Sequence, residues 1–455
     1  MKRVGVTGFV LAAVALAVTM LGCSEETNKY YYYYTSDEEA SEDTSDGEAA
    51  GDTSADDSPS AEDSSGSVDD TDDDTSGSGE DTDSSGTGDD DTTSAEDSSG
   101  SGDEADDTSG SGDEADEDDA AENTYDSATM TSVIASIEDN ATVVLPEDTS
   151  EEDLEKLVGL LAGYSGLTLD MSAAALITAI TAEAFYECTA LTSIILPDTI
   201  ESIGSYAFYG CTSLAAITIP DGVTSIEQYT FSGCSSLVSV ELPSELESIG
   251  SYAFYGCSSL AEIAIPEGVT SIGQQAFREC TSLAAIAIPE GITSIGQSTF
   301  FDCTSLVSVE LPSTLTSIGK YAFHTCTSLA SLELPSAVTS ISLGAFFECT
   351  LLDDVVLPEG ITAVSSYLFD KCTSLAQIII PDEVTSIGSY AFYGCSSLES
   401  VELYSDVESV GTSAFAECSS LATVSYHGEQ SDYEAMTVED GNTCFTDITP
   451  TYVSD

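Results

Sequence analysis

The chain has 455 residues, of which 83 are acidic and only 7 are lysine or arginine, and its formal net charge is -76. This charge excludes binding to a nucleic-acid backbone, because phosphate contacts require lysine and arginine. It also disfavours lying on an anionic lipid surface. The same charge favours solubility and basic partners.

Residues 1–22 are predicted to be an export signal. Lys2 and Arg3 precede an apolar stretch, residues 9–20, which is too short to span a bilayer. The stretch ends at Gly22-Cys23, which resembles a bacterial lipobox, so Cys23 is the predicted lipidation site and membrane anchor. An ordinary secretory signal followed by an incidental cysteine is the alternative. We therefore expect an exported, membrane-anchored protein at the cell surface, held in the outer membrane or cell envelope.

Residues 23–122 are predicted to be a disordered acidic tether. Between Asp37 and Glu122 there are 36 acidic residues and no lysine, arginine or aromatic residue. Such a segment cannot bury enough apolar area to offset its ordering entropy, and its charges repel one another. A chain of this length spans roughly 50–60 Å. We expect weak, diffuse binding of divalent cations, since no EF-hand loop is present.

From Cys188 onward the sequence repeats every 23 residues. Counting from each cysteine, Leu lies three on, aliphatic residues lie six and eight on, Ile or Val lies fifteen on, and Phe lies twenty on. The alternation at six and eight predicts a short strand with one buried face. The Ile or Val predicts a second extended piece, and Ala-Phe-x-x-Cys predicts a helical or 3₁₀ turn. Stacked copies would form a solenoid, with each apolar position becoming a ladder through the core.

The repeat resembles the BspA-like (treponemal type) leucine-rich repeat of bacterial surface proteins. The resemblance rests on Leu-x-x-Ile-x-Ile-Pro followed by Ser-Ile-Gly-x-x-Ala-Phe-x-x-Cys, from Ala184 to about Val424. It implies a solenoid of about eleven repeats over residues 181–424, with a parallel sheet on its concave side. It also implies display at the cell surface, binding of extracellular proteins of a host or neighbouring cell, and no common catalytic site.

Both ends of the array are predicted to be caps. In the N-terminal cap, residues 123–180, Ala141 to Pro146 reads as a strand and Ser150 with Asp153 resembles a capping box before an amphipathic helix. Leu167 to Met171 reads as a further strand. In the C-terminal cap, residues 425–455, the sequence departs from the repeat and resembles a closing turn.

The repeat cysteines invite a metal or redox interpretation, but metal ligands must converge on one point and these lie in a line. We expect them to be buried free thiols, with Cys444 outside the ladder. His324 occupies a place held by tyrosine in other repeats, and we expect it to be a surface variant. We predict no enzyme activity, no metal site and no cofactor.

Two sets of residues are candidate ligand contacts. The residue seven on from each cysteine should point outward from the first strand, and its acidic members are Glu241, Glu310, Glu333 and Glu402. The second set is a tyrosine ladder formed by Tyr206, Tyr252, Tyr321, Tyr367 and Tyr390. For the tyrosines, shielding of the solenoid edge is the alternative to ligand contact.

The expected function is capture of an extracellular protein, as an adhesin or receptor, with the tether providing reach. Two alternatives remain open at this point. The solenoid could have a structural role in the envelope through self-association or packing on the cell wall, or it could bind carbohydrate through its tyrosines.

Overall fold

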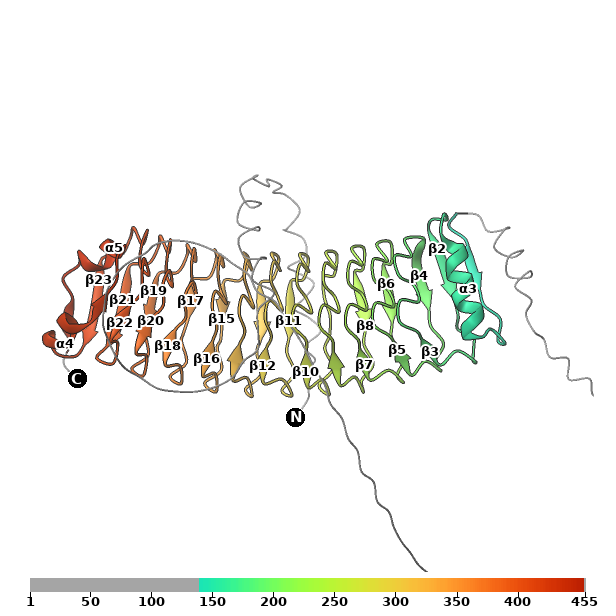
Figure 1. Cartoon of the computed structure of the whole chain (residues 1–455), viewed down its shortest axis with the longest axis horizontal. Coiled ribbons are helices and arrows are strands. Elements are labelled where there is room, and N and C mark those ends of the chain that lie inside the picture. Colours follow the sequence, from blue (N-terminus) through green and yellow to red (C-terminus); the bar gives the residue numbers. More distant parts are fainter. Residues whose placement is uncertain (1–138, 454–455) are drawn as a thin grey trace, which may run out of the picture. The chain divides into compact units, whose positions relative to one another are not determined.

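The computed structural model describes residues 139–453, which form a parallel β-solenoid (Figure 1). One repeat makes one turn, because the strand register pairs residues 23 apart, as Ser317 pairs with Ser294 and Ser340. The predicted leucine-rich-repeat type of solenoid, with a parallel sheet and a 23-residue turn, is therefore confirmed. The predicted signal peptide 1–22, Cys23 and the tether 23–122 lie outside the described residues.

In the repeats, the strands of the first row contain the aliphatic residue six on from each cysteine, and most of them end before the one eight on. All of its pairs are parallel. The strands are β1 (Thr142–Val144), β2 (Leu167–Asp170), β4 (Leu191–Ile195), β6 (Ala216–Thr218), β8 (Ser239–Glu241), β11 (Ala285–Ala287), β13 (Ser308–Glu310), β15 (Ser331–Leu332), β17 (Asp354–Val355), β19 (Gln377–Ile379), β21 (Ser400–Tyr404), β23 (Thr423–His427) and β25 (Thr451–Val453).

The predicted first sheet is present in separate hydrogen-bonded segments. Their orders are β1-β2-β4-β6-β8, β11-β13, β15-β17 and β19-β21-β23-β25. Residues 261–266 form no strand, although they occupy the equivalent place between β8 and β11. The pattern of apolar residues did not indicate these interruptions.

A second row of short strands contains the Ile or Val fifteen on from each cysteine. It lies below the first row in Figure 1. Its members are β3 (Ala179–Ile180), β5 (Ser202–Ile203), β7 (Ser225–Ile226), β9 (Ser248–Ile249), β10 (Ser271–Ile272), β12 (Ser294–Ile295), β14 (Ser317–Ile318), β16 (Ser340–Ile341), β18 (Ala363–Val364), β20 (Ser386–Ile387), β22 (Ser409–Val410) and β24 (Thr437–Val438). They pair in parallel within four separate segments: β3-β5, β7-β9-β10, β12-β14-β16 and β18-β20-β22-β24.

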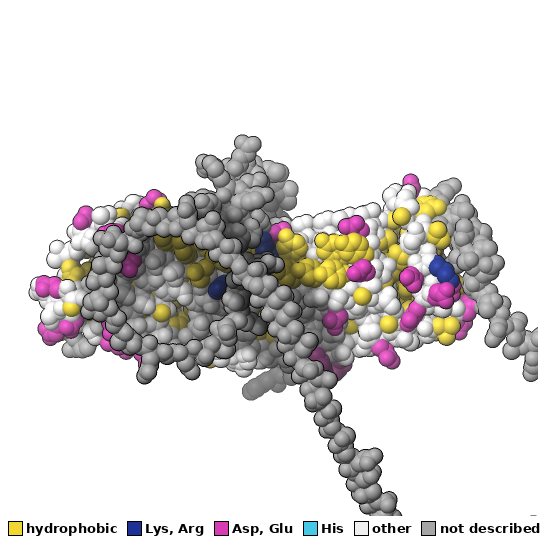
Figure 2. Space-filling view, in the orientation of Figure 1, with side chains coloured by type: hydrophobic (Ala, Val, Ile, Leu, Met, Phe, Trp, Pro, Cys, Tyr) yellow, Lys and Arg dark blue, Asp and Glu magenta, His cyan; other side chains and the backbone are white. Residues whose placement is uncertain are grey.

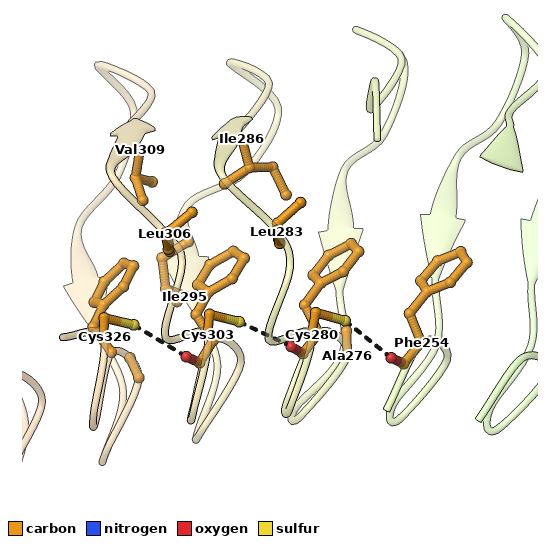
Figure 3. Close-up of a cluster of buried hydrophobic side chains, with 14 of the residues drawn as sticks. Phe254, Ala276, Cys280, Leu283, Ile286, Ile295, Cys303, Leu306, Val309 and Cys326 are labelled. Atoms are coloured by element: carbon orange, nitrogen blue, oxygen red, sulfur yellow. Dashed lines mark hydrogen bonds between the residues drawn. The ribbon is translucent and has the colours of Figure 1, made fainter. Parts of the chain in front are cut away.

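Ladders of identical side chains fill the core between the two rows (Figure 3). The phenylalanine rings from Phe185 to Phe415 are fully buried, and neighbouring rings stack with centroids 5.0–5.7 Å apart. The Ala-Phe-x-x-Cys segments form consecutive turns, in which the Cys211 amide donates to the Phe208 carbonyl at 3.2 Å. No helix forms there in the described repeats, and the predicted 3₁₀ segment is a run of tight turns instead.

The eleven repeat cysteines are buried and free, as expected. Their packing includes a hydrogen bond that the sequence did not suggest. The Cys280 thiol donates to the Phe254 carbonyl oxygen at 3.2 Å, and the same contact recurs at 3.0–3.2 Å from Cys211 to Cys418 (Figure 3). The Phe254 carbonyl also accepts from the Cys257 amide at 3.1 Å, so both of its lone pairs are used.

The N-terminal cap is a helix, α3 (Glu151–Leu161), beside strands β1 and β2. Its capping box is confirmed: the Ser150 hydroxyl accepts from the Asp153 amide, and the Asp153 carboxylate accepts from the Ser150 amide, both at 3.3 Å. Leu154, Leu157 and Leu161 are buried on its inner face. The helix therefore covers the first turn of the core.

The C-terminal cap closes the other end with two short helices, α4 (Gln430–Ala435) and α5 (Thr443–Thr446). Phe445 stacks on Phe415 with centroids 4.8 Å apart and so ends the phenylalanine ladder. The Asn442 side chain accepts from the Phe415 amide at 2.9 Å and donates to the Gly411 carbonyl at 2.9 Å. The first of these bonds satisfies a backbone amide that pairs with the next turn in the regular repeats, as the Phe392 amide does with the Ala414 carbonyl.

Across residues 139–453, no helix has the length and apolar character needed to cross a membrane.

Candidate functional site

The outward side chains of the first strand row form one continuous surface. We call it the first-strand face and define it by the residues four, five and seven on from each repeat cysteine. The side chains six and eight on, such as Ile217 and Ile219, are buried beneath it. No lysine or arginine occupies these positions in any described repeat.

An apolar stripe crosses six successive turns of this face. It consists of the residues four on from each cysteine, of which Val238 is 51% exposed and Val307 is 55% exposed. Figure 2 shows hydrophobic surface along the row that contains β6 and β8, with carboxylates beside it. The sequence analysis missed this stripe, although aligning the repeats would have revealed it. Its members are Ala215, Val238, Ala261, Ala284, Val307 and Ala330.

The four predicted glutamates do not share one environment. Glu241 is exposed and its carboxylate accepts from the Thr218 hydroxyl at 3.2 Å. Glu310 and Glu333 are exposed on successive turns, where β13 and β15 do not pair. Glu402 is half-buried, and its carboxylate lies 2.7 Å from the His427 ring nitrogen. Glu402 is therefore part of the C-terminal packing, in contrast to the other three.

A hollow of about 620 Å³ opens on the N-terminal part of this face. Ile195, Thr218, Glu241, Glu262 and Ala264 are among its lining residues. It brings Glu241 together with a second carboxylate, Glu262, that was not among the predicted contacts. Both carboxylates lie against apolar side chains, a combination suited to a cationic group on an apolar stem.

The tyrosine ladder lies on a different edge, among the tight turns. Its members are half-buried and have left-handed φ angles, such as 60° at Tyr206. Tyr229 also belongs to it and was missed by the sequence analysis: its ring stacks on Tyr206 at 4.7 Å and on Tyr252 at 4.5 Å. Both faces of the Tyr229 ring are therefore covered. Because a sugar ring would bind to the face of an aromatic ring, Tyr229 offers no such surface. This arrangement favours the edge-shielding interpretation.

A second aromatic stack runs beside the tyrosines, and it changes the interpretation of His324. The His324 ring lies between Phe301 and Phe347, with centroids 4.4 Å and 4.6 Å apart. The Arg278 guanidinium lies 4.5 Å from the Phe301 centroid. His324 is half-buried rather than a surface variant, and burial lowers its pKa to about 3, so it is neutral.

Asp370 places a buried carboxyl group among the tight turns, on the same edge as the tyrosines and His324. Its side chain is 4% exposed, and its Oδ1 atom has no hydrogen-bond partner. Burial raises the Asp370 pKa to about 7, although Lys371 acts in the opposite direction. Near neutral pH, ionisation of this buried carboxyl group therefore destabilises the folded protein.

The thiols of the cysteine ladder are poorly suited to chemistry. Burial raises the pKa of Cys188 to about 11 and that of Cys418 to about 12. The nucleophilic thiolate is therefore scarce at neutral pH. Within the described part of the chain, no group of three or more His, Cys, Asp or Glu side chains is arranged to hold a metal ion.

Repeats of this length, with a parallel strand row and a phenylalanine spine, define a leucine-rich-repeat solenoid. The family model described as the BspA type leucine rich repeat region matches residues 178–306 and 270–384, in six copies. The chain belongs to this family. Its members are typically bacterial cell-surface proteins, and the fold is often used for protein interaction.

Several solved structures are similar to this chain. A leucine rich cell surface protein from Faecalibacterium prausnitzii is 27% identical, with 62% of this chain and 84% of that chain covered and a TM-score of 0.36. A leucine-rich repeat protein from Bacteroides ovatus is 27% identical, with 61% and 88% covered and a TM-score of 0.35. A T. pallidum leucine-rich repeat protein is 31% identical, with 41% and 77% covered and a TM-score of 0.34. The comparison with curated proteins gives no match.

Proposed function

We propose that this protein is an exported, lipid-anchored surface protein that binds an extracellular protein through its first-strand face. The observation that carries the proposal is the apolar stripe, which is exposed over five successive turns, from Ala215 to Val307, and is flanked by carboxylates. Contiguous exposed apolar surface rimmed by polar groups is typical of protein-binding sites. Membership of a family found at bacterial cell surfaces supports the location.

The charge of the face limits the kind of partner. Glu241, Glu262, Glu310 and Glu333 are exposed on it, and no lysine or arginine opposes them. A partner with basic and apolar side chains would therefore be attracted and retained, whereas an acidic one would be repelled. The predicted tether would hold this face away from the membrane, where extracellular proteins are accessible.

Site-specific photo-crosslinking tests the proposal in the full chain. A photoreactive residue at Val238 or Val307 should crosslink to an extracellular protein, and the same residue at Ser202, on the second strand row, should not. The captured protein, once purified, should bind the full chain with an affinity that falls as salt rises. Equal crosslinking from all three positions would contradict the proposal. Crosslinks between copies of this chain would favour the structural, self-associating alternative.

A further inference from the structure

The hollow on the first-strand face coincides with the first interruption of the sheet. On its N-terminal side, β6 and β8 pair in regular register and the Ile219 amide donates to the Glu241 carbonyl at 2.9 Å. At the next turn the ladder stops. In the described structure, the amides of residues 262–265 donate to no neighbouring turn. Pairing resumes between β11 and β13.

Two carboxylates face each other across this interruption. Glu241 lies seven residues on from its cysteine, and Glu262 lies five on in the following turn, so they are diagonal neighbours on the same face. Diagonal neighbours of adjacent strands have Cβ atoms about 7–8 Å apart. Acids also accompany the interruption between β13 and β15, but there Glu310 and Glu333 both lie seven residues on from their cysteines and so occupy equivalent, not diagonal, positions.

The hollow is large enough to receive a long cationic side chain, and its lining of two carboxylates and small apolar residues suits one. Ala216 and Ala264 are small exposed residues in the lining, and Ile195 is 46% exposed at its edge. Lysine and arginine place their aliphatic stems on apolar surface and keep the charged head in a polar environment. A guanidinium offers several donors, and it can serve two carboxylates at once.

We propose that the hollow binds a single arginine or lysine side chain from an extended segment of the partner protein. The cationic head lies between Glu241 and Glu262, and the stem lies over Ala216 and Ala264. Apolar residues next to it in the segment contact Val238 and Ala261 of the stripe. The inference rests on the proposed function, which it deepens by naming the anchor that the partner supplies.

Occupancy of the hollow has a structural consequence. A cation between Glu241 and Glu262 removes the repulsion of two like charges on adjacent turns. Residues 262–265 can then approach β8 and complete the ladder. Binding should therefore slow amide hydrogen exchange at residues 262–265, where the free protein forms no inter-turn hydrogen bonds.

The test uses the purified full chain and a defined probe, a synthetic peptide in which arginine alternates with valine. The probe is titrated against the wild-type chain and the double variant Glu241→Gln, Glu262→Gln. The matched control is Glu310→Gln with Glu333→Gln, which makes the same charge change on the same face outside the hollow. We expect the hollow variant to weaken binding about tenfold or more and the control to weaken it less than about threefold. A peptide with citrulline in place of arginine should bind as weakly to the wild type as the arginine peptide binds to the hollow variant.

The outcomes separate this inference from the proposed function. Equal weakening by both double variants would overturn the hollow as an anchor and leave the first-strand face as the binding surface. Unchanged exchange at residues 262–265 in the saturated complex would also overturn it. If the arginine peptide binds no better than the citrulline peptide while Val238 still crosslinks to a partner, the anchor is wrong and the face is right. Loss of crosslinking from Val238 and Val307 would refute the face itself.

Discussion

Phe254 and Tyr255 are adjacent in the sequence but occupy opposite environments. Phe254 is fully buried between Phe231 and Phe277, with centroids 5.5 Å and 5.4 Å away. Phe254→Ala should lower the free energy of unfolding by about 3–5 kcal/mol, because it opens a cavity between turns. Tyr255 is half-buried, and its hydroxyl donates to Glu279 at 3.2 Å. Tyr255→Ala should cost much less, and equal shifts in chemical denaturation would contradict this assignment.

Asp370 should make stability depend on pH. Its folded pKa of about 7 lies above the ordinary value of 3.8, so the folded state binds the proton more tightly than the unfolded state. The stabilising contribution is fully present below the ordinary value and is lost as pH rises through about 7. Between these values the free energy of unfolding should fall by about 1.4 kcal/mol per pH unit from this group.

The measurement compares the wild type with Asp370→Asn in denaturant titrations from pH 4 to pH 8. The difference in the free energy of unfolding between the two proteins should fall with pH by this amount, because the other carboxylates are common to both. Parallel stability curves over this range would show that the Asp370 carboxyl group is solvated in the folded protein.

At the scale of the element, the tight Ala-Phe-x-x-Cys turns determine how reactive the repeat cysteines are. Each ladder thiol from Cys211 to Cys418 donates to a phenylalanine carbonyl, and burial raises the pKa of thiols such as Cys257 and Cys303. We expect the ladder thiols to resist alkylation by iodoacetamide in the native state and to react fully in denaturant. Cys444 is only partly buried and should react first. Mass spectrometry of the labelled peptides gives the order in which the cysteines react. Labelling of ladder cysteines before Cys444 would contradict the expectation.

The strands of the first row are short, and two acids lie beside one of the places where neighbouring strands do not pair. Glu310 and Glu333 lie on successive turns where β13 and β15 do not pair. Replacing both with Gln should stabilise the free solenoid slightly, by about 0.2–1 kcal/mol, because like charges on adjacent strands are destabilising. Thermal unfolding at low salt measures the gain, which should shrink at high salt. No gain at low salt would mean that water already screens the pair.

At the scale of the whole molecule, stability depends on contacts between neighbouring turns and on the two caps. Helix α3 covers the first turn, and Phe445 and Asn442 close the last one. The caps are necessary because an uncovered turn would expose both apolar side chains and strand edges.

The proposed membrane anchor also belongs to the scale of the whole molecule. Cys23→Ala should release the protein from the membrane or block removal of the predicted signal, because acyl chains contribute about 0.8 kcal/mol per buried methylene. Detergent phase partitioning and the mass of the mature chain measure both effects. Normal processing together with unchanged partitioning would show that the lipobox interpretation is wrong.

The sequence by itself determined the repeating core. A period of 23 residues, with Phe, Cys, Leu and Ile at fixed places, permits one solution: equivalent residues stack, since no single turn can bury them alone. The capping box at Ser150 was equally predictable, because a cap depends only on residues close in sequence.

Only the tertiary structure decided the features that depend on neighbouring turns. The interruption at residues 261–266, the hollow that joins Glu241 to Glu262, the pairing of Glu402 with His427 and the burial of His324 each involve side chains from different repeats. The period gives the register of these side chains, but their distances depend on how closely the turns pack and on how charges repel across them. Those are properties of the assembled solenoid, set by burial and electrostatics between turns.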